Sequence, residues 1–163
     1  MKSLMTLFLR FLEFLGLGFW LGSDVFLSFV VAPGAFRVLA SRDQAGTIVG
    51  YSLTRMHLGG ILCGVVFLLA RLLRTRTFAS YATAPALCAV AMIALTVISQ
   101  YTVSAKMAAL RLQMGSIQAT EPGSSLLAEF TRLHGISVAM ESGVLLAGFA
   151  ALYLSVREIS VPN

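Results

Sequence analysis

The chain has little charge. Only 12% of its 163 residues are Asp, Glu, Lys or Arg, whereas 58% are hydrophobic. A soluble domain usually has about 25% charged residues, so the composition argues against a water-soluble globule and against a disordered chain. The basic residues lie at the ends of apolar stretches, as in proteins that contact lipid headgroups, and not in a patch with aromatic residues. We therefore expect the lipid bilayer, and no nucleic acid, as a partner.

Cysteine and the usual catalytic motifs are equally scarce. The two cysteines, Cys63 and Cys88, lie far apart in apolar surroundings and form no CxxC pair, so we interpret them as small buried hydrophobic residues. The sequence contains no phosphate-binding loop, nucleophile elbow, HExxH motif or dinucleotide fingerprint. Nothing here favours an enzyme. We expect a non-enzymatic membrane protein, either a membrane subunit or a factor that handles a small solute or a metal.

What the sequence does have is four long apolar segments. A membrane-spanning helix needs about 20 mostly apolar residues, and the segments predict spans over residues 11–31, 47–73, 80–104 and 126–156. Residues 33–34, Pro-Gly, predict a kink or an end after the first span. The sequence therefore predicts a single domain over residues 1–163, an all-α bundle of four transmembrane helices built as two hairpins.

The turn at residues 71–76 bears on the orientation of the bundle. It holds three arginines and no acidic residue, and four spans place it on the same membrane side as both termini. Loops rich in Lys and Arg face the cytoplasm most often when they are short and adjoin the spans. Although the total number of basic residues is equal on the two sides, this turn predicts that both termini are cytoplasmic, in the inner membrane of a bacterium.

Small residues at four-residue spacing predict where helices approach closely in lipid. They occur in three of the four spans, and the longest series, in the last span, predicts a central packing helix. The predicted packing positions are Gly18 and Gly22 in the first span, Gly60 and Gly64 in the second, and Gly135, Ala139, Gly143, Ala147 and Ala151 in the fourth.

A short string occurs twice. Residues 53–57 are Leu-Thr-Arg-Met-His and residues 130–134 are Phe-Thr-Arg-Leu-His, each near the start of an even-numbered span. The repeat predicts that His57 and His134, the two histidines of the chain, lie at similar depth on parallel helices. Three interpretations remain open: helix-end hydrogen bonding, a proton relay, or paired ligands for haem b or a transition metal.

Charged residues within the spans are the other candidates for a site. A charge at the bilayer centre is costly and should face the bundle interior with a partner. Asp24 and Glu141 are the two deepest acids, and Glu141 follows His134 by seven residues, which places both on one helix face. Arg55 and Arg132 are expected either to pair with these acids or to reach the headgroups.

Two interpretations of these acids remain open, a buried ion pair that fixes helix register and a proton-linked or cation-binding site. Four spans in one copy are few for a carrier, so a proton-coupled transporter that uses Asp24 and Glu141 would be an oligomer. A homo-oligomer and a subunit of a membrane complex are the expected assemblies.

The motifs also resemble a known family. Residues 20–33, Trp-Leu-Gly-Ser-Asp-Val-Phe-Leu-Ser-Phe-Val-Val-Ala-Pro, followed by Phe36 and by Ala45-Gly46, resemble the first half of the transmembrane-protein-205-like domain. The string Phe130-x-Arg132-Leu133-His134-Gly135-x-Ser137 resembles its last span. The resemblance implies a small four-span membrane domain whose molecular function is not established.

Overall fold

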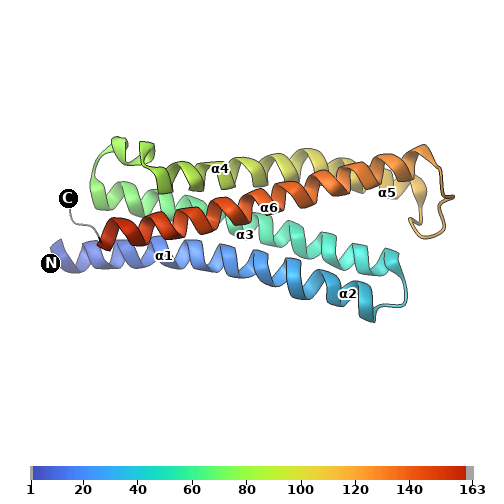
Figure 1. The fold of residues 1–163 in the computed structure, drawn as a ribbon, viewed down its shortest axis with the longest axis horizontal. Helices are drawn as coiled ribbons and strands as arrows, with labels where there is room; N and C mark the ends of the chain where they lie inside the picture. The colour runs from blue at the N-terminus through green and yellow to red at the C-terminus, as the bar shows by residue number, and fades with distance from the viewer. Residues whose placement is uncertain (1, 161–163) are drawn as a thin grey trace.

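The computed structural model describes residues 2–160, and in that range it contains helices and no strand. Four rods lie side by side along one long axis (Figure 1). The elements are α1 (Lys2–Phe26), the π-helix η1 (Leu27–Val31), α2 (Ala32–Val38), α3 (Arg42–Thr75), the 3-10 helix η2 (Phe78–Ala82), α4 (Ala84–Ile98), the π-helix η3 (Ser99–Ser104), α5 (Ala105–Met114) and α6 (Ser125–Ser160).

Each rod is long and apolar enough to cross a membrane. The candidate spans are Ser3–Val38, Arg42–Thr75, Ala84–Met114 and Ser125–Ser160. The prediction of an all-α four-helix bundle is confirmed, and the protein is an integral membrane protein. The helices extend beyond the expected spans at most ends. The third is the exception at its start, because residues 78–82 form the separate 3-10 turn and the helix begins at Ala84.

The first rod does not end at Pro33, where the sequence predicted a kink or an end. The preceding turn widens into η1, and the backbone N–H of Ala32 donates to the carbonyl of Leu27, five residues back. Proline lacks an N–H, and its ring collides with the carbonyl four residues before it in a regular α-helix. The wider turn relieves that collision, so the helix continues to Val38.

The rods form two hairpins, with the start of α1 and the end of α6 on one side of the bundle, which we call the terminal side (Figure 1). The opposite end, formed by residues 39–41 and 115–124, is the loop side. α1 packs against α3 and α6, and α4 packs against the same two helices. Within the described residues, the backbone of α3 makes no close contact with the backbone of α6. These two helices therefore stand at diagonal corners of the bundle.

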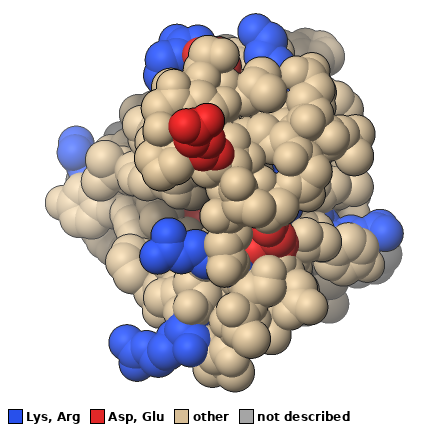
Figure 2. Space-filling view, turned by 90° about the vertical axis from the view of Figure 1, so that its right-hand side faces the viewer, with Lys and Arg blue, Asp and Glu red and all other residues tan. Residues whose placement is uncertain are grey.

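The loop side is held together by hydrogen bonds between the hairpins. The Ser41 hydroxyl caps α3 by accepting from the N–H groups of Asp43 and Gln44. The Asp43 carboxylate accepts from the Ser116 hydroxyl at 2.6 Å and from the Ile117 N–H at 2.8 Å. This end shows scattered basic and acidic side chains on a largely uncharged surface (Figure 2).

The terminal side is closed by a buried ion-pair network. The Arg71 side chain is 3% exposed and binds Glu158 at 2.5 Å, with Glu13 Oε2 3.7 Å from its other terminal nitrogen. Arg74 Nε donates to Glu13 Oε1 at 2.7 Å. The carbonyl of Ser80 accepts from Arg71 Nε. These contacts join α1, α3, η2 and α6. Of the three arginines in residues 71–76, Arg71 and Arg74 are therefore paired with acidic residues.

Glycines allow α1 and α3 to pack closely against each other. A Cβ placed on Gly60 would overlap the indole of Trp20, and one on Gly64 would lie 2.7 Å from Trp20 Cζ3. Gly18 and Gly22, predicted as packing positions on α1, instead face open space. The glycine of α1 that packs closely is Gly16, whose Cβ would lie 2.9 Å from the carbonyl oxygen of Cys63.

The small residues of α6 divide into two groups. Gly135 and Ala139 are exposed, and no atom lies within 4 Å of a Cβ built on Gly135, so the packing prediction is wrong there. Ala147 and Ala151 pack in the core with Trp20 and Phe67, and a Cβ on Gly143 would contact Leu95. The tightest position on α6 is Gly148, against Leu21 and Met92.

Candidate functional site

A polar centre lies inside the apolar bundle, with one side chain from each rod: Asp24, His57, Gln100 and Glu141. His57 Nε2 is 2.6 Å from Glu141 Oε1, and His57 Nδ1 is 2.7 Å from Gln100 Oε1. The side chain of His57 is 0% exposed and that of Glu141 is 12% exposed. Because α3 and α6 are diagonal, the His57–Glu141 hydrogen bond crosses the core of the bundle.

Asp24 completes this centre from α1. It is 0% exposed, and it accepts a hydrogen bond on Oδ1 from the Ser28 hydroxyl at 3.3 Å. Its carboxyl group interacts electrostatically with both Glu141 and His57. Asp24 Oδ2 and Glu141 Oε2 have no hydrogen-bonding partner in the described part of the chain. The centre therefore holds two carboxyl groups around one imidazole, each with a free oxygen.

The packing contacts explain why these four side chains meet at one level. Gly60 lies beside Trp20, and Gly64 lies beside Ile93. Since α3 runs antiparallel to both α1 and α4, these two contacts place His57 opposite Asp24 and Gln100. The register is therefore fixed by glycines in contact with large side chains, a turn or two away from the polar centre.

The hydrogen bonds restrict where protons can sit. Gln100 Oε1 is an acceptor, so Nδ1 of His57 carries a hydrogen. The contact between Nε2 and Glu141 then has two forms, an imidazolium beside a carboxylate or a neutral imidazole beside a carboxylic acid. Both forms contain one proton in the contact and carry no net charge. With Asp24 ionised the centre has a charge of −1, and one further proton makes it neutral.

Two irregular turns adjoin the centre. η1 begins three residues after Asp24, and η3 contains Gln100. π-turns within α-helices are frequent at functional sites because they reorient side chains and free backbone groups. Thr96 and Ser99 lie four residues and one residue before Gln100 and are 0% exposed, and neither hydroxyl has a hydrogen-bonding partner in residues 2–160. Polar groups thus continue from Gln100 along the inner face of α4.

His134 takes no part in this centre. It is exposed, whereas His57 is buried. The hydrogen bond to Glu141 puts His57 level with a residue seven positions beyond His134, which is about 10 Å along a helix. A bis-histidine haem or a shared metal needs both ligating nitrogens within about 4 Å. The prediction of equal depth and shared ligation by His57 and His134 is therefore wrong. No group of three or more His, Cys, Asp or Glu in residues 2–160 is arranged to hold a metal.

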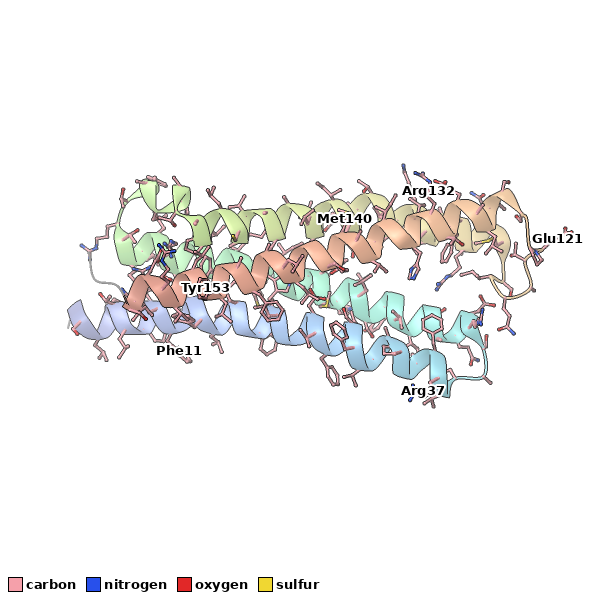
Figure 3. All side chains as sticks on the ribbon, viewed as in Figure 1. Phe11, Arg37, Glu121, Arg132, Met140 and Tyr153 are labelled. Carbon is pink, nitrogen blue, oxygen red and sulfur yellow. The ribbon has the colours of Figure 1, made fainter. Side chains whose placement is uncertain are left out.

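The two arginines of the repeated string also lie outside the centre. Arg55 is exposed, with its guanidinium 5.2 Å from the ring centre of Tyr51. Arg132 binds Glu129 at 2.7 Å, and it points away from the bundle (Figure 3). Neither arginine pairs with Asp24 or Glu141. Of the two roles expected for them, pairing with these acids is not found, and both arginines lie at the surface of the bundle.

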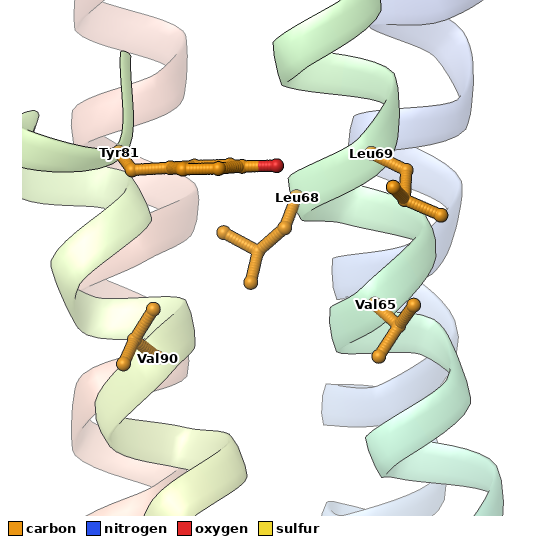
Figure 4. A pocket seen from close by; sticks show the side chains of 5 residues that line it. All are labelled: Val65, Leu68, Leu69, Tyr81 and Val90. Atoms are coloured by element: carbon orange, nitrogen blue, oxygen red, sulfur yellow. The ribbon is translucent and has the colours of Figure 1, made fainter. Parts of the chain in front are cut away.

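An apolar groove of about 400 Å³ lies elsewhere on the bundle, between α3 and α4. Its lining is Val65, Leu68, Leu69, Tyr81 and Val90, and the Tyr81 ring lies across the groove with its hydroxyl toward α3 (Figure 4). The phenol is the one polar group of that lining. The groove suits contact with lipid chains and offers no acid, base or ligand set, so the polar centre is the candidate functional site.

Sequence reasoning found three of the four side chains and missed Gln100. The missed signal was an amide within the longest uncharged segment, residues 77–105. A buried side-chain amide in a span needs a partner, and His57 is that partner. Ser28, four residues after Asp24, was likewise visible as a local donor on the same helix face.

Comparison with known proteins gives a match to a family model. The family model described as a domain of unknown function, DUF4149, matches residues 15–116, well over half of the chain. No curated protein and no solved structure matches it. The resemblance to the transmembrane-protein-205-like domain is therefore corrected, because strings of small and aromatic residues recur in membrane helices of different families. The chain belongs to the DUF4149 family, a family defined by a domain of unknown function.

Proposed function

We propose that this protein is a non-enzymatic, proton-coupled membrane transporter in which Asp24, His57 and Glu141 bind and release one proton. The observation that carries the proposal is the buried polar centre, where an imidazole lies hydrogen-bonded between an amide and a carboxyl group with a second carboxyl group beside it. Ionisable residues inside a membrane bundle mark ion pathways and proton relays more often than structural sites.

Charge supports this assignment. The centre changes from −1 to neutral when it takes up one proton, and no basic side chain other than His57 is hydrogen-bonded or ion-paired to its carboxyl groups in the described residues. Moving a full charge to the bilayer centre costs at least about 2.5–3.5 kcal/mol. Proton uptake therefore changes the energy of the bundle substantially, which is the property that coupling to a conformational change or to solute movement requires.

The proposed assembly is an oligomer, since one copy has few helices with which to enclose a path for a solute. We further place the protein in a bacterial inner membrane with both termini in the cytoplasm. Arg71 and Arg74 lie at the end of α3 and Arg76 directly follows it, so the expected turn is largely helical, but all three arginines lie on the terminal side. Pairing with acids does not weaken this argument, because acidic residues contribute little to orientation.

The test is infrared difference spectroscopy of the protein in lipid as pH is changed. Protonation of a buried carboxyl group adds a C=O stretching band that ionised carboxylates lack. We expect a reversible band in the native protein that is altered or lost in Asp24→Asn and in Glu141→Gln. Glu129→Gln on the exposed surface of α6 is the control and should leave this band unchanged. A spectrum that is the same in the native protein and in both buried-acid variants would refute the proposal.

A further inference from the structure

The bundle is not equally closed at its two ends. On the terminal side of the polar centre lie the packed side chains of Leu17, Trp20, Phe67 and Val144, all at most 1% exposed. Beyond them is the Arg71 ion-pair network already described. On α4 the polar groups of Ser99 and Thr96 extend about one turn in this direction and end at Met92, which is 0% exposed in the same cluster, so no continuous line of polar side chains leads from the centre to the terminal side.

Toward the loop side the packing differs. α2 contacts α3 and η1, and in the described residues it has no backbone neighbour in α6. The rod that ends in α2 and the first half of α6 lie apart at this end (Figure 1). α6 consequently loses its cover from the first rod beyond the level of Asp24, and His134 is exposed there. This opening is lateral, between α2 and α6.

A line of polar side chains follows the opening. Glu141, Ser137 and His134 are spaced at four and three residues on α6, so they lie on one helix face. Exposure along this line is greatest at its loop-side end. Ser137 is 6% exposed and has no hydrogen-bonding partner among the described residues, and His134 is exposed. At the inner end, 12% of the Glu141 side chain is exposed, although its Oε2 is buried without a hydrogen-bonding partner among the described residues, and His57 and Asp24 are fully buried.

We propose that an aqueous route enters the bundle between α2 and α6 on the loop side and leads past His134 and Ser137 to Glu141, which is the group that exchanges protons with it. His134 stands at the mouth, where its exposed ring nitrogens can hydrogen-bond with water. Seven residues of helix span about 10 Å, a distance that Ser137 divides into two short steps. Access to the centre is one-sided in this conformation.

This inference rests on the proposed function for its purpose but is tested separately, by the chemistry of single cysteines. Cys63 and Cys88 are first replaced by alanine. Ser137→Cys, Ser155→Cys and Val138→Cys are then made one at a time and placed in lipid nanodiscs, where reagents reach both membrane sides. Each variant is treated with a charged, water-soluble methanethiosulfonate and, separately, with an apolar maleimide that dissolves in lipid.

The route predicts that Ser137→Cys reacts with the charged reagent. Ser155, which is 4% exposed on the terminal half of the same helix, should stay unlabelled. Val138, the exposed neighbour of Ser137, should react only with the apolar reagent, because it faces lipid. Labelling of Ser137→Cys by the apolar reagent alone would show that lipid fills the opening, and no labelling by either reagent would show that it is sealed; each result overturns the route.

The two proposals fail in distinguishable ways. If Ser137→Cys is labelled by the charged reagent but the infrared band is the same in the native protein, Asp24→Asn and Glu141→Gln, the aqueous route is supported and the proton-binding proposal is refuted. If the band is altered in Asp24→Asn and Glu141→Gln but Ser137→Cys remains unlabelled, the proton site is supported and the aqueous route is refuted.

Discussion

The close contact between α1 and α3 gives a prediction with a calculable magnitude. Gly60 and Gly59 are adjacent in α3, yet a Cβ on Gly60 meets Trp20, with Cε2 at 2.5 Å and Cδ1 at 2.8 Å, whereas a Cβ on Gly59 meets no atom within 4 Å. Trp20 is 1% exposed and is packed among Phe67, Met92 and other core residues, so its indole cannot move aside without displacing them.

Replacing either glycine by alanine lowers the backbone entropy lost on folding and contributes roughly 0.5–1 kcal/mol of stability. This gain is common to both sites, so it cancels in the comparison. Gly60→Ala also forces the indole or the backbone to shift, and overpacking of a core costs about 1–3 kcal/mol. We therefore expect Gly60→Ala to be less stable than Gly59→Ala by about 1–3 kcal/mol.

The assay is denaturant unfolding of both variants in mixed micelles, followed by the helical circular dichroism signal. Equal free energies of unfolding for the two variants would refute the packing argument, and with it the register that aligns His57 with Asp24. A loss of stability in both variants would also contradict it, because Gly59 faces open space.

Two other predictions follow from the ends of the bundle. In a cysteine-free background expressed in bacterial cells, Ala119→Cys on the loop side should react with an impermeant thiol reagent, and Ala79→Cys on the terminal side should not; the opposite pattern would reverse the proposed orientation. Arg71→Met should lower the free energy of unfolding by about 1–3 kcal/mol, because it leaves the carbonyl of buried Ser80 without its donor, whereas buried Glu13 keeps Arg74 as a partner. Arg132→Gln breaks an exposed pair and should have no measurable effect; similar losses in the two variants would show that burial does not set the strength of these pairs.

The fold was predictable because composition and the length of apolar segments dominate it. Four stretches of sufficient length and few charges allow few arrangements in a bilayer. Helix ends were less predictable. Pro33 is a clear stop signal in sequence, but a π-turn removes the conflict between its ring and the carbonyl four residues before it. That accommodation depends on the backbone of one turn, and no residue type at positions 27–31 announces it.

The polar centre was predictable in part. Asp24, His57 and Glu141 are conspicuous as ionisable residues in spans, and the cost of burying a charge forces such side chains inward. The partner of His57 could not be predicted from the repeated strings. A local similarity between residues 53–57 and 130–134 does not determine the axial position of each helix relative to its neighbours. The actual register is set by contacts of Gly60 and Gly64 with large side chains, which pair His57 with Glu141 and leave His134 seven residues away.

Small-residue spacing was an incomplete guide for a similar reason. Gly18 and Gly22 have the same spacing as Gly60 and Gly64, but they lie on the outer face of α1. Spacing identifies a helix face, and only the position of the neighbouring rods decides whether that face is covered. Gly16 is covered and Gly18 is not, although two residues separate them.

The most direct measurement of the central claim is the nitrogen-15 spectrum of His57 in lipid bilayers across pH. His134→Gln leaves His57 as the one histidine of the chain, so its two ring nitrogens are read without overlap. The account predicts that Nδ1 stays protonated through its bond to Gln100 while the Nε2 signal shifts in a single reversible step, and that Asp24→Asn and Glu141→Gln each change that step. An Nε2 signal that does not respond to pH while the protein stays folded, or one that responds identically in both acid variants and in the parent, would contradict a proton-binding centre.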